Sequence, residues 1–159
     1  MVAASLTGGT RHADAPASPA HDIAPDLVHA QTLYQSGKYA AAAGLLQASL
    51  AASERWLAAD QLDATAHYLH AMLLQERGER GQARAALQRA VYLQPEFTLA
   101  HFALGNHARA EARVTEARRH FANAARLLEG LPADTPIPES EGLTAGRLRE
   151  IIVSLGMDT

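Results

Sequence analysis

Cysteine is absent from this chain of 159 residues, and aromatic residues make up only 5% of it. The lack of cysteine excludes disulfides and cysteine metal sites, and it agrees with the cytoplasmic location that we expect. No apolar run approaches the ~18 residues of a membrane span, so we expect no membrane insertion. Residues 1–10 lack the apolar core of a signal peptide.

The chain also has little excess charge of either sign, since its formal net charge is only -3. This small value gives no indication of a nucleic-acid partner. Residues 77–126 nevertheless contain nine Arg and four Glu. These arginines either form a basic face or alternate around solvent-exposed helix surfaces and pair with nearby glutamates, which is the interpretation we favour.

Abundant Ala, Leu, Gln, Glu and Arg predict an all-α fold. Residues 64–97 and 98–131 align at a step of 34 residues, the period of the tetratricopeptide repeat (TPR), in which two antiparallel helices form each unit of a solenoid. Small residues recur where paired helices must cross closely. In the two units they are Ala71, Ala83 and Ala90, followed by Gly105, Ala117 and Ala124.

An earlier unit aligns when Gly37 is matched with the turn residue Gly78, at a step of 41 residues. The seven additional residues fall within 49–63, which predicts a second helix that is longer by about two turns. We therefore expect a flexible tail at 1–22 and a TPR domain at 23–131. Its repeats span about 23–63, 64–97 and 98–131, and a Pro-rich segment with a capping helix follows at 132–159.

The capping helix is expected after Ser140, a residue type that caps helix N-termini. Its apolar residues fall on one side and would cover the exposed end of the last repeat. Glu139 and Glu141 would then lie near the helix N-terminus, where negative charge is favourable. Gly156 is the expected stop.

Eight histidines raise the question of a metal site, with His67 and His70 three residues apart. The repeat alignment favours packing instead, because His29 and His70 share the inward position of Leu104, and His67 shares a position with His101. No serine or carboxylate pattern resembles a catalytic site. We expect no catalytic residues, no metal and no enzyme activity in this chain.

Function is therefore expected in a surface, the groove that the first helices of successive repeats would line. An amphipathic helix or an extended peptide of a partner protein would fit it. Alternatively, residues 131–138 or the last helix fill the groove from within. The predicted groove residues are Leu27, Gln31, Tyr34, Tyr68, Met72, Gln75, Leu99, Phe102, Asn106 and Arg109.

The tail at residues 131–152, LPADTPIPESEGLTAGRLREII, follows these repeats. Together they resemble the C-terminal region of CheR-type chemotaxis protein-glutamate methyltransferases of the WspC and FrzF kind. The resemblance implies a regulatory or targeting module of a chemosensory signal transduction enzyme. Its partner would be its own methyltransferase domain, a chemoreceptor cytoplasmic domain or another signalling protein.

That family carries an α/β domain that binds S-adenosylmethionine, and no alternating strand and helix pattern of this kind occurs here. We therefore expect this chain to be the C-terminal module of a larger methyltransferase and to hold no cofactor itself. The alternative is a generic TPR adaptor or scaffold unrelated to chemotaxis.

Overall fold

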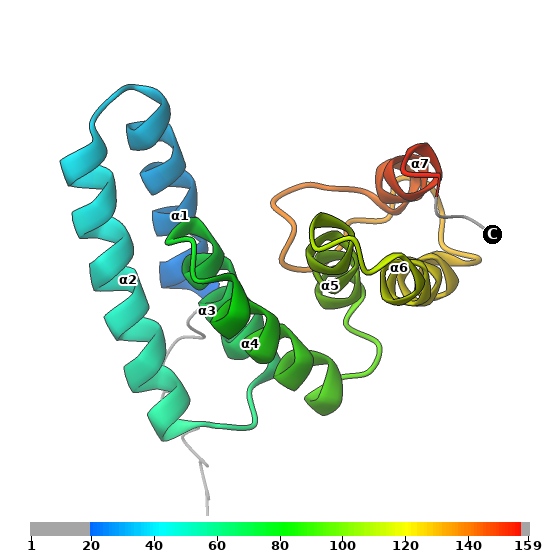
Figure 1. Cartoon of the computed structure of the whole chain (residues 1–159), viewed down its shortest axis with the longest axis horizontal. Helices are drawn as coiled ribbons and strands as arrows, with labels where there is room; N and C mark the ends of the chain where they lie inside the picture. The colour runs from blue at the N-terminus through cyan, green and yellow to red at the C-terminus, as the bar shows by residue number, and fades with distance from the viewer. Residues whose placement is uncertain (1–19, 157–159) are drawn as a thin grey trace, which may run out of the picture.

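The computed structural model describes residues 20–156, and in this part of the chain seven α-helices follow one another (Figure 1). They form three antiparallel pairs and a final single helix, so the predicted all-α, TPR-like architecture is confirmed. The helices are α1 Ala20–Gln35, α2 Tyr39–Ala59, α3 Ala64–Glu76, α4 Arg80–Leu93, α5 Thr98–Ala110, α6 Val114–Leu128 and α7 Ala145–Ser154.

The long second helix of the first pair is confirmed as well. Helix α2 has 21 residues, whereas α4 has 14 and α6 has 15. Helix α1 begins at Ala20, slightly before the predicted boundary at residue 22. The tail at residues 1–19 lies outside the described residues, and the domain boundaries stay a prediction.

Small residues occupy the helix crossings as the repeat pattern predicts. Ala71, Ala83 and Ala90 have no exposed surface where α3 packs against α4. In the next pair Gly105 is buried, and a Cβ atom added to it would lie 2.7 Å from a ring carbon of Phe121. The close approach of α5 and α6 therefore depends on the missing side chain.

Each pair turns through one residue in the left-handed backbone region. The residues are Gly37 with φ 79°, Gly78 with φ 80° and Ala112 with φ 56°. Glycine adopts this conformation readily, whereas alanine does so at a cost of about 1 kcal/mol. The third turn thus keeps the geometry of the other two despite the unfavourable residue.

Helix α7 packs against α6 and covers the end of the stack, with Leu148 and Ile152 buried. The predicted cap is wrong: the N-cap is Thr144, whose Oγ1 accepts the Arg147 N–H at 3.3 Å, and Leu143 lies outside the helix. The hydroxyl of Ser140 instead donates within the preceding loop.

Arg149 ties α7 to the preceding helix. Its Nη1 donates to the carbonyl oxygens of Leu128 at 2.8 Å and Leu131 at 3.0 Å, where the end of α6 leaves acceptors free. Gly156 follows the helix with φ 65°, which agrees with its predicted role as the stop. No helix within residues 20–156 has the length and apolar character needed to cross a membrane.

Candidate functional site: a groove along the first helices

A hollow of about 340 Å³ runs along α1, α3 and α5, the first helices of the three pairs. Eight of the ten predicted groove residues line it: Leu27, Gln31, Tyr68, Met72, Gln75, Leu99, Phe102 and Asn106. Tyr34 lines a separate hollow, and Arg109 lines neither. We call this surface, with the loop residues described below, the groove.

The repeat register explains why these side chains meet. Leu27, Tyr68 and Phe102 are equivalent positions in the three units, at steps of 41 and 34 residues. One helical turn further along lie Gln31, Met72 and Asn106, which are also equivalent. Because stacked repeats place equivalent positions side by side, one apolar row and one mixed row form the floor of the groove.

Two aromatic rings of the floor are supported from behind. Tyr68 packs on Phe97 with ring centroids 5.0 Å apart, and Phe102 packs on Phe121 at 5.7 Å. Tyr68 is only 8% exposed, while Phe102, Met72 and Leu27 are half-buried. The half-buried residues therefore offer the apolar surface that a ligand would cover.

The segment between α6 and α7 supplies one wall of the groove. In Figure 1 this segment, drawn in orange, runs past α5 before it turns back to α7. Ile137 is buried at 6% exposure, and its N–H donates to the Leu143 carbonyl at 2.9 Å. Residues Glu139, Ser140, Glu141 and Leu143 line the hollow. The groove is thus partly occupied from within, by residues that follow the predicted 131–138 stretch, and part of its floor stays open.

These loop residues are the part of the lining that the sequence interpretation missed. The sequence signal for them is the segment PIPESEG, which carries the family resemblance, while its two glutamates are expected near a helix N-terminus. In the structure Glu139 and Glu141 lie at the groove instead, and burial, together with the charges of both glutamates, raises the pKa of Tyr68 to about 12. The Tyr68 hydroxyl therefore stays protonated at neutral pH.

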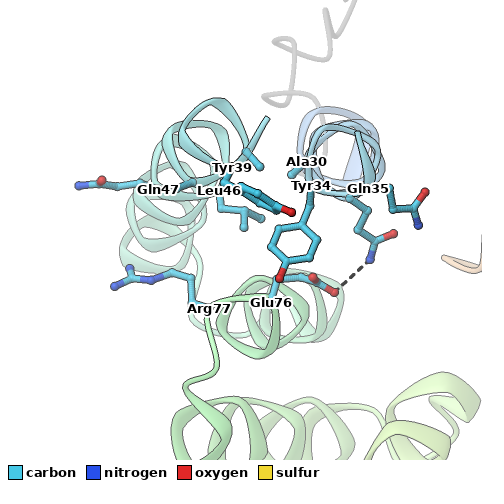
Figure 2. Close-up of a pocket in the computed structure, with 11 residues that line it drawn as sticks. Ala30, Tyr34, Gln35, Tyr39, Leu46, Gln47, Glu76 and Arg77 are labelled. Atoms are coloured by element: carbon cyan, nitrogen blue, oxygen red, sulfur yellow. Dashed lines mark hydrogen bonds between the residues drawn. The ribbon is translucent and has the colours of Figure 1, made fainter. Parts of the chain in front are cut away.

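A second hollow, of about 740 Å³, opens between α1, α2 and the end of α3 (Figure 2). Tyr34 and Tyr39 meet edge to face here, with centroids 5.0 Å apart, and both are more than half exposed. Gln31 Nε2 donates to Glu76 Oε1 at 3.0 Å. Since Gln31 lines both hollows, this bond lies between the groove and the second hollow.

The arginines of residues 77–126 are partly paired with glutamates, as the favoured interpretation expects. The Glu111 carboxylate forms ion pairs with Arg84 at 3.1 Å and with Arg113 at 2.8 Å. Because Arg84 lies on α4, the first of these links the second helix pair to the third. Arg77 pairs with Glu79 at 2.9 Å. These partners are partly exposed, so each pair contributes little to stability.

The histidines divide into packed and exposed residues. His101 is buried, and its Nε2 donates to the Pro95 carbonyl at 2.7 Å, whereas His70 is half-buried with Nδ1 2.8 Å from Ser53 Oγ. The packing prediction is wrong for His29, which is exposed on α1. His107 and His120, which the repeat alignment did not single out, are buried.

Neither protein-family models nor curated protein sequences give a match to this chain. Among solved structures, the chain is similar to SycD, a type III secretion translocator chaperone of Yersinia enterocolitica, with a TM-score of 0.55 and 17% identity over 85% of this chain and 87% of that one. SycD in complex with a peptide of the translocator YopD gives a TM-score of 0.50 and 17% identity, over 86% and 95% of the two chains.

A third similar structure is a Thermobaculum terrenum O-GlcNAc transferase mutant, with a TM-score of 0.50 and 30% identity. The match covers 69% of this chain but only 20% of the transferase chain. The similarity to SycD extends over most of both chains, and it shows that this chain has a TPR-like fold.

Proposed function

We propose that this chain is an interaction module that binds an extended peptide segment of a partner protein in the groove. The observation that carries the proposal is a set of half-buried apolar side chains, Leu27, Met72 and Phe102, one from each of three successive first helices and drawn from both rows of the floor. Flexible Met72 can adapt to different apolar side chains. An aromatic ring held rigidly from behind is a suitable anchor.

The polar residues of the groove suit a peptide backbone. Gln31, Gln75 and Asn106 line the hollow, and each amide can both donate and accept hydrogen bonds. An extended peptide presents the N–H and C=O groups that such amides would bind. A segment of about 20 non-hydrogen atoms, at about 0.3 kcal/mol each, corresponds to a Kd on the order of tens of micromolar.

The fold comparison supports the capacity for peptide binding but not the identity of the partner. SycD, a chaperone of the same fold, is found in complex with a peptide of the translocator YopD. The present proposal extends only to the class of ligand, a segment of another polypeptide. Its role in the cell would be that of an adaptor or scaffold.

A groove-filling substitution tests the proposal without removing any core side chain. Ala103 lines the groove on α5, so Ala103→Gln should project a longer side chain into the hollow. Ala85→Gln on α4 is a matched control, because Ala85 is exposed and lies outside the groove. Both changes have the same small cost in helix propensity.

The probe is a fluorescein-labelled library of short peptides with leucine at alternate positions, selected on the wild-type chain and then measured singly by fluorescence anisotropy. We expect Ala103→Gln to weaken binding by about tenfold or more, a loss of about 1.4 kcal/mol, and Ala85→Gln to bind like the wild type. Equal affinity of the two variants for every selected peptide, or failure of the wild type to select any, would contradict the proposal.

A more specific function rests on the tail sequence alone. Its PxPxSEGxTAGRLxE pattern resembles the tail of CheR-type methyltransferases, which favours a regulatory or targeting module of a chemoreceptor glutamate methyltransferase. The parent protein would then use S-adenosylmethionine in a separate domain. A pull-down with chemoreceptor cytoplasmic domains and with the separate catalytic domain tests this: binding to neither favours the generic adaptor.

A further inference from the structure

Two glutamates at the wall of the groove adopt an unusual backbone conformation. Glu139 has φ 63° and Glu141 has φ 53°, both in the left-handed region. Residues with a side chain disfavour this region, so each of the two glutamates must be held in place by its surroundings. The loop does so through the Ser140 hydroxyl, whose one proton is shared between the carbonyl oxygens of Ile137 and Leu143.

The loop thus presents two carboxylates, both exposed, along one edge of an apolar hollow. Within residues 20–156 the ion pairs join other carboxylates, and neither Glu139 nor Glu141 has a basic side chain within 4.0 Å. The described lining of the groove contains no Lys, Arg or His. Within the described residues, the negative charge at this edge is therefore not neutralised by an ion pair.

The rest of the described lining is uncharged, so Glu139 and Glu141 are the charged side chains of this lining. Their effect on a neighbour is visible at Tyr68, whose pKa they raise in addition to the larger effect of burial. A carboxylate that disfavours a phenolate at this position would favour a cation there, because the same field acts on both charges with opposite sign. A peptide that complements both the apolar floor and the acidic edge would carry an apolar side chain next to a cationic one.

We propose that the groove binds peptide segments in which a Lys or Arg lies next to an apolar anchor residue, with the cationic group at Glu139 and Glu141 and the anchor on Met72 and Phe102. This inference rests on the proposed function and adds the charge of the partner to it. The recognition element comes from the loop between α6 and α7, outside the helix pairs.

In this arrangement the segment PIPESEG both anchors the loop and supplies the two carboxylates of the groove. Ile137 is buried against the repeats and fixes the loop, and the two glutamates that follow face the hollow. A purely structural loop would not need negative charge at these two positions, because Gln could adopt the same backbone. The charge itself is therefore the property to test.

The test compares two synthetic versions of one leucine-containing peptide selected on the wild-type chain. One has Lys and the other has norleucine at the position next to the anchor leucine. The variant is Glu139→Gln/Glu141→Gln. The control Glu54→Gln/Glu129→Gln removes the same charge from exposed residues on α2 and at the end of α6, outside the groove. Anisotropy is measured at low and at high salt.

We expect the wild type and the control to bind the Lys version about fivefold more tightly at low salt, and the preference to shrink at high salt. The Gln variant should bind both versions equally. The charge reversal Glu139→Lys/Glu141→Lys should favour norleucine over Lys, which a loop with only a structural role would not produce.

Equal affinity of the wild type for both versions, or a Lys preference that survives in the Gln variant, would overturn the inference. If Ala103→Gln still weakens binding in that case, peptide binding in the groove stands and only the charge preference fails. If no peptide binds the wild type at all, both fail together.

Discussion

The buried histidine of α6 predicts that the fold loses stability in mild acid. His120 is 7% exposed and faces His101 of α5, with the two Nδ1 atoms 3.5 Å apart. Burial, followed by the charges of Arg119 and His101, lowers the pKa of His120 from 6.5 to about 4. Glu116, 3.9 Å from His120 Nε2, opposes this shift, and Arg113 adds to it.

The sign follows from proton linkage. Above pH 6.5 the imidazole is neutral in both states, so it has no effect on the free energy of unfolding. Between pH 6.5 and about 4 the unfolded chain binds a proton that folded His120 does not, and unfolding becomes more favourable as the pH falls. Below about pH 4 folded His120 is protonated as well, so the destabilisation has reached its full size and no longer grows as the pH falls.

The expected size of the effect is measurable. From pH 8 to pH 5, a pKa of about 4 in the folded state reduces the free energy of unfolding by about 2 kcal/mol. For a chain of this length that corresponds to a fall in Tm of about 6 °C. Burial also lowers the pKa values of His70 and His107, which act in the same direction.

Thermal unfolding followed by circular dichroism at both pH values is the assay. The variant His120→Gln cannot be protonated, so its fall in Tm should be smaller than that of the wild type by about 6 °C. His29→Gln, at an exposed position of α1, should behave like the wild type. A wild-type Tm that is unchanged between pH 8 and pH 5, or an equal fall in His120→Gln, would refute the reasoning.

Two substitutions between glycine and alanine test the repeat packing. Gly105→Ala should lower the free energy of unfolding by about 1–3 kcal/mol, because the new Cβ would lie 2.7 Å from the Phe121 ring; an unchanged Tm would show that α5 and α6 can separate freely. Ala112→Gly should raise it by about 1 kcal/mol, since glycine suits φ 56°, whereas the control Ala122→Gly, at an exposed position inside α6, should lower it. Equal Tm changes for the two glycine variants would contradict the turn assignment.

The helix pairs could be predicted from sequence because the repeat makes a physical demand at fixed spacing. Close helix crossings tolerate only small side chains, and Ala71, Ala83 and Ala90 meet that demand visibly in one unit. The longer α2 was predictable for a similar reason. The same turn residue, Gly37 or Gly78, fixed the register on both sides of the insertion.

The histidines show where repeat register fails. His29, His70 and Leu104 are equivalent positions, yet they are exposed, half-buried and buried in turn. In a solenoid a repeat contacts only its neighbours, so a position that faces the preceding repeat is covered only if such a repeat exists. His70 has such a neighbour, since its Nδ1 lies 2.8 Å from Ser53 Oγ of α2, whereas the described residues include no helix that takes this place beside His29.

The loop before α7 was not predictable, because Ser140 and Thr144 are both good capping residues and both precede an apolar run. Long-range contacts decide between them. Pro136 and Thr144 form an isolated antiparallel bridge, and Ala145 N–H donates to the Thr135 carbonyl at 2.8 Å. These contacts extend the loop to residue 143 and bring Glu139 and Glu141 to the groove instead of to a helix terminus.

The loop contributes to stability and to the proposed peptide binding through different residues. Ile137 is buried and Arg149 binds the end of α6, so changes at either residue would disturb the packing of α7 as well as the groove wall. Glu139 and Glu141 are exposed and make no ion pair within the described chain, so their charge contributes little to the fold. Strained backbone without a stabilising charge contact agrees with the proposed role of these two carboxylates in peptide binding. That separation is the physical reason to vary the two carboxylates, and not the loop as a whole, when the peptide preference is measured.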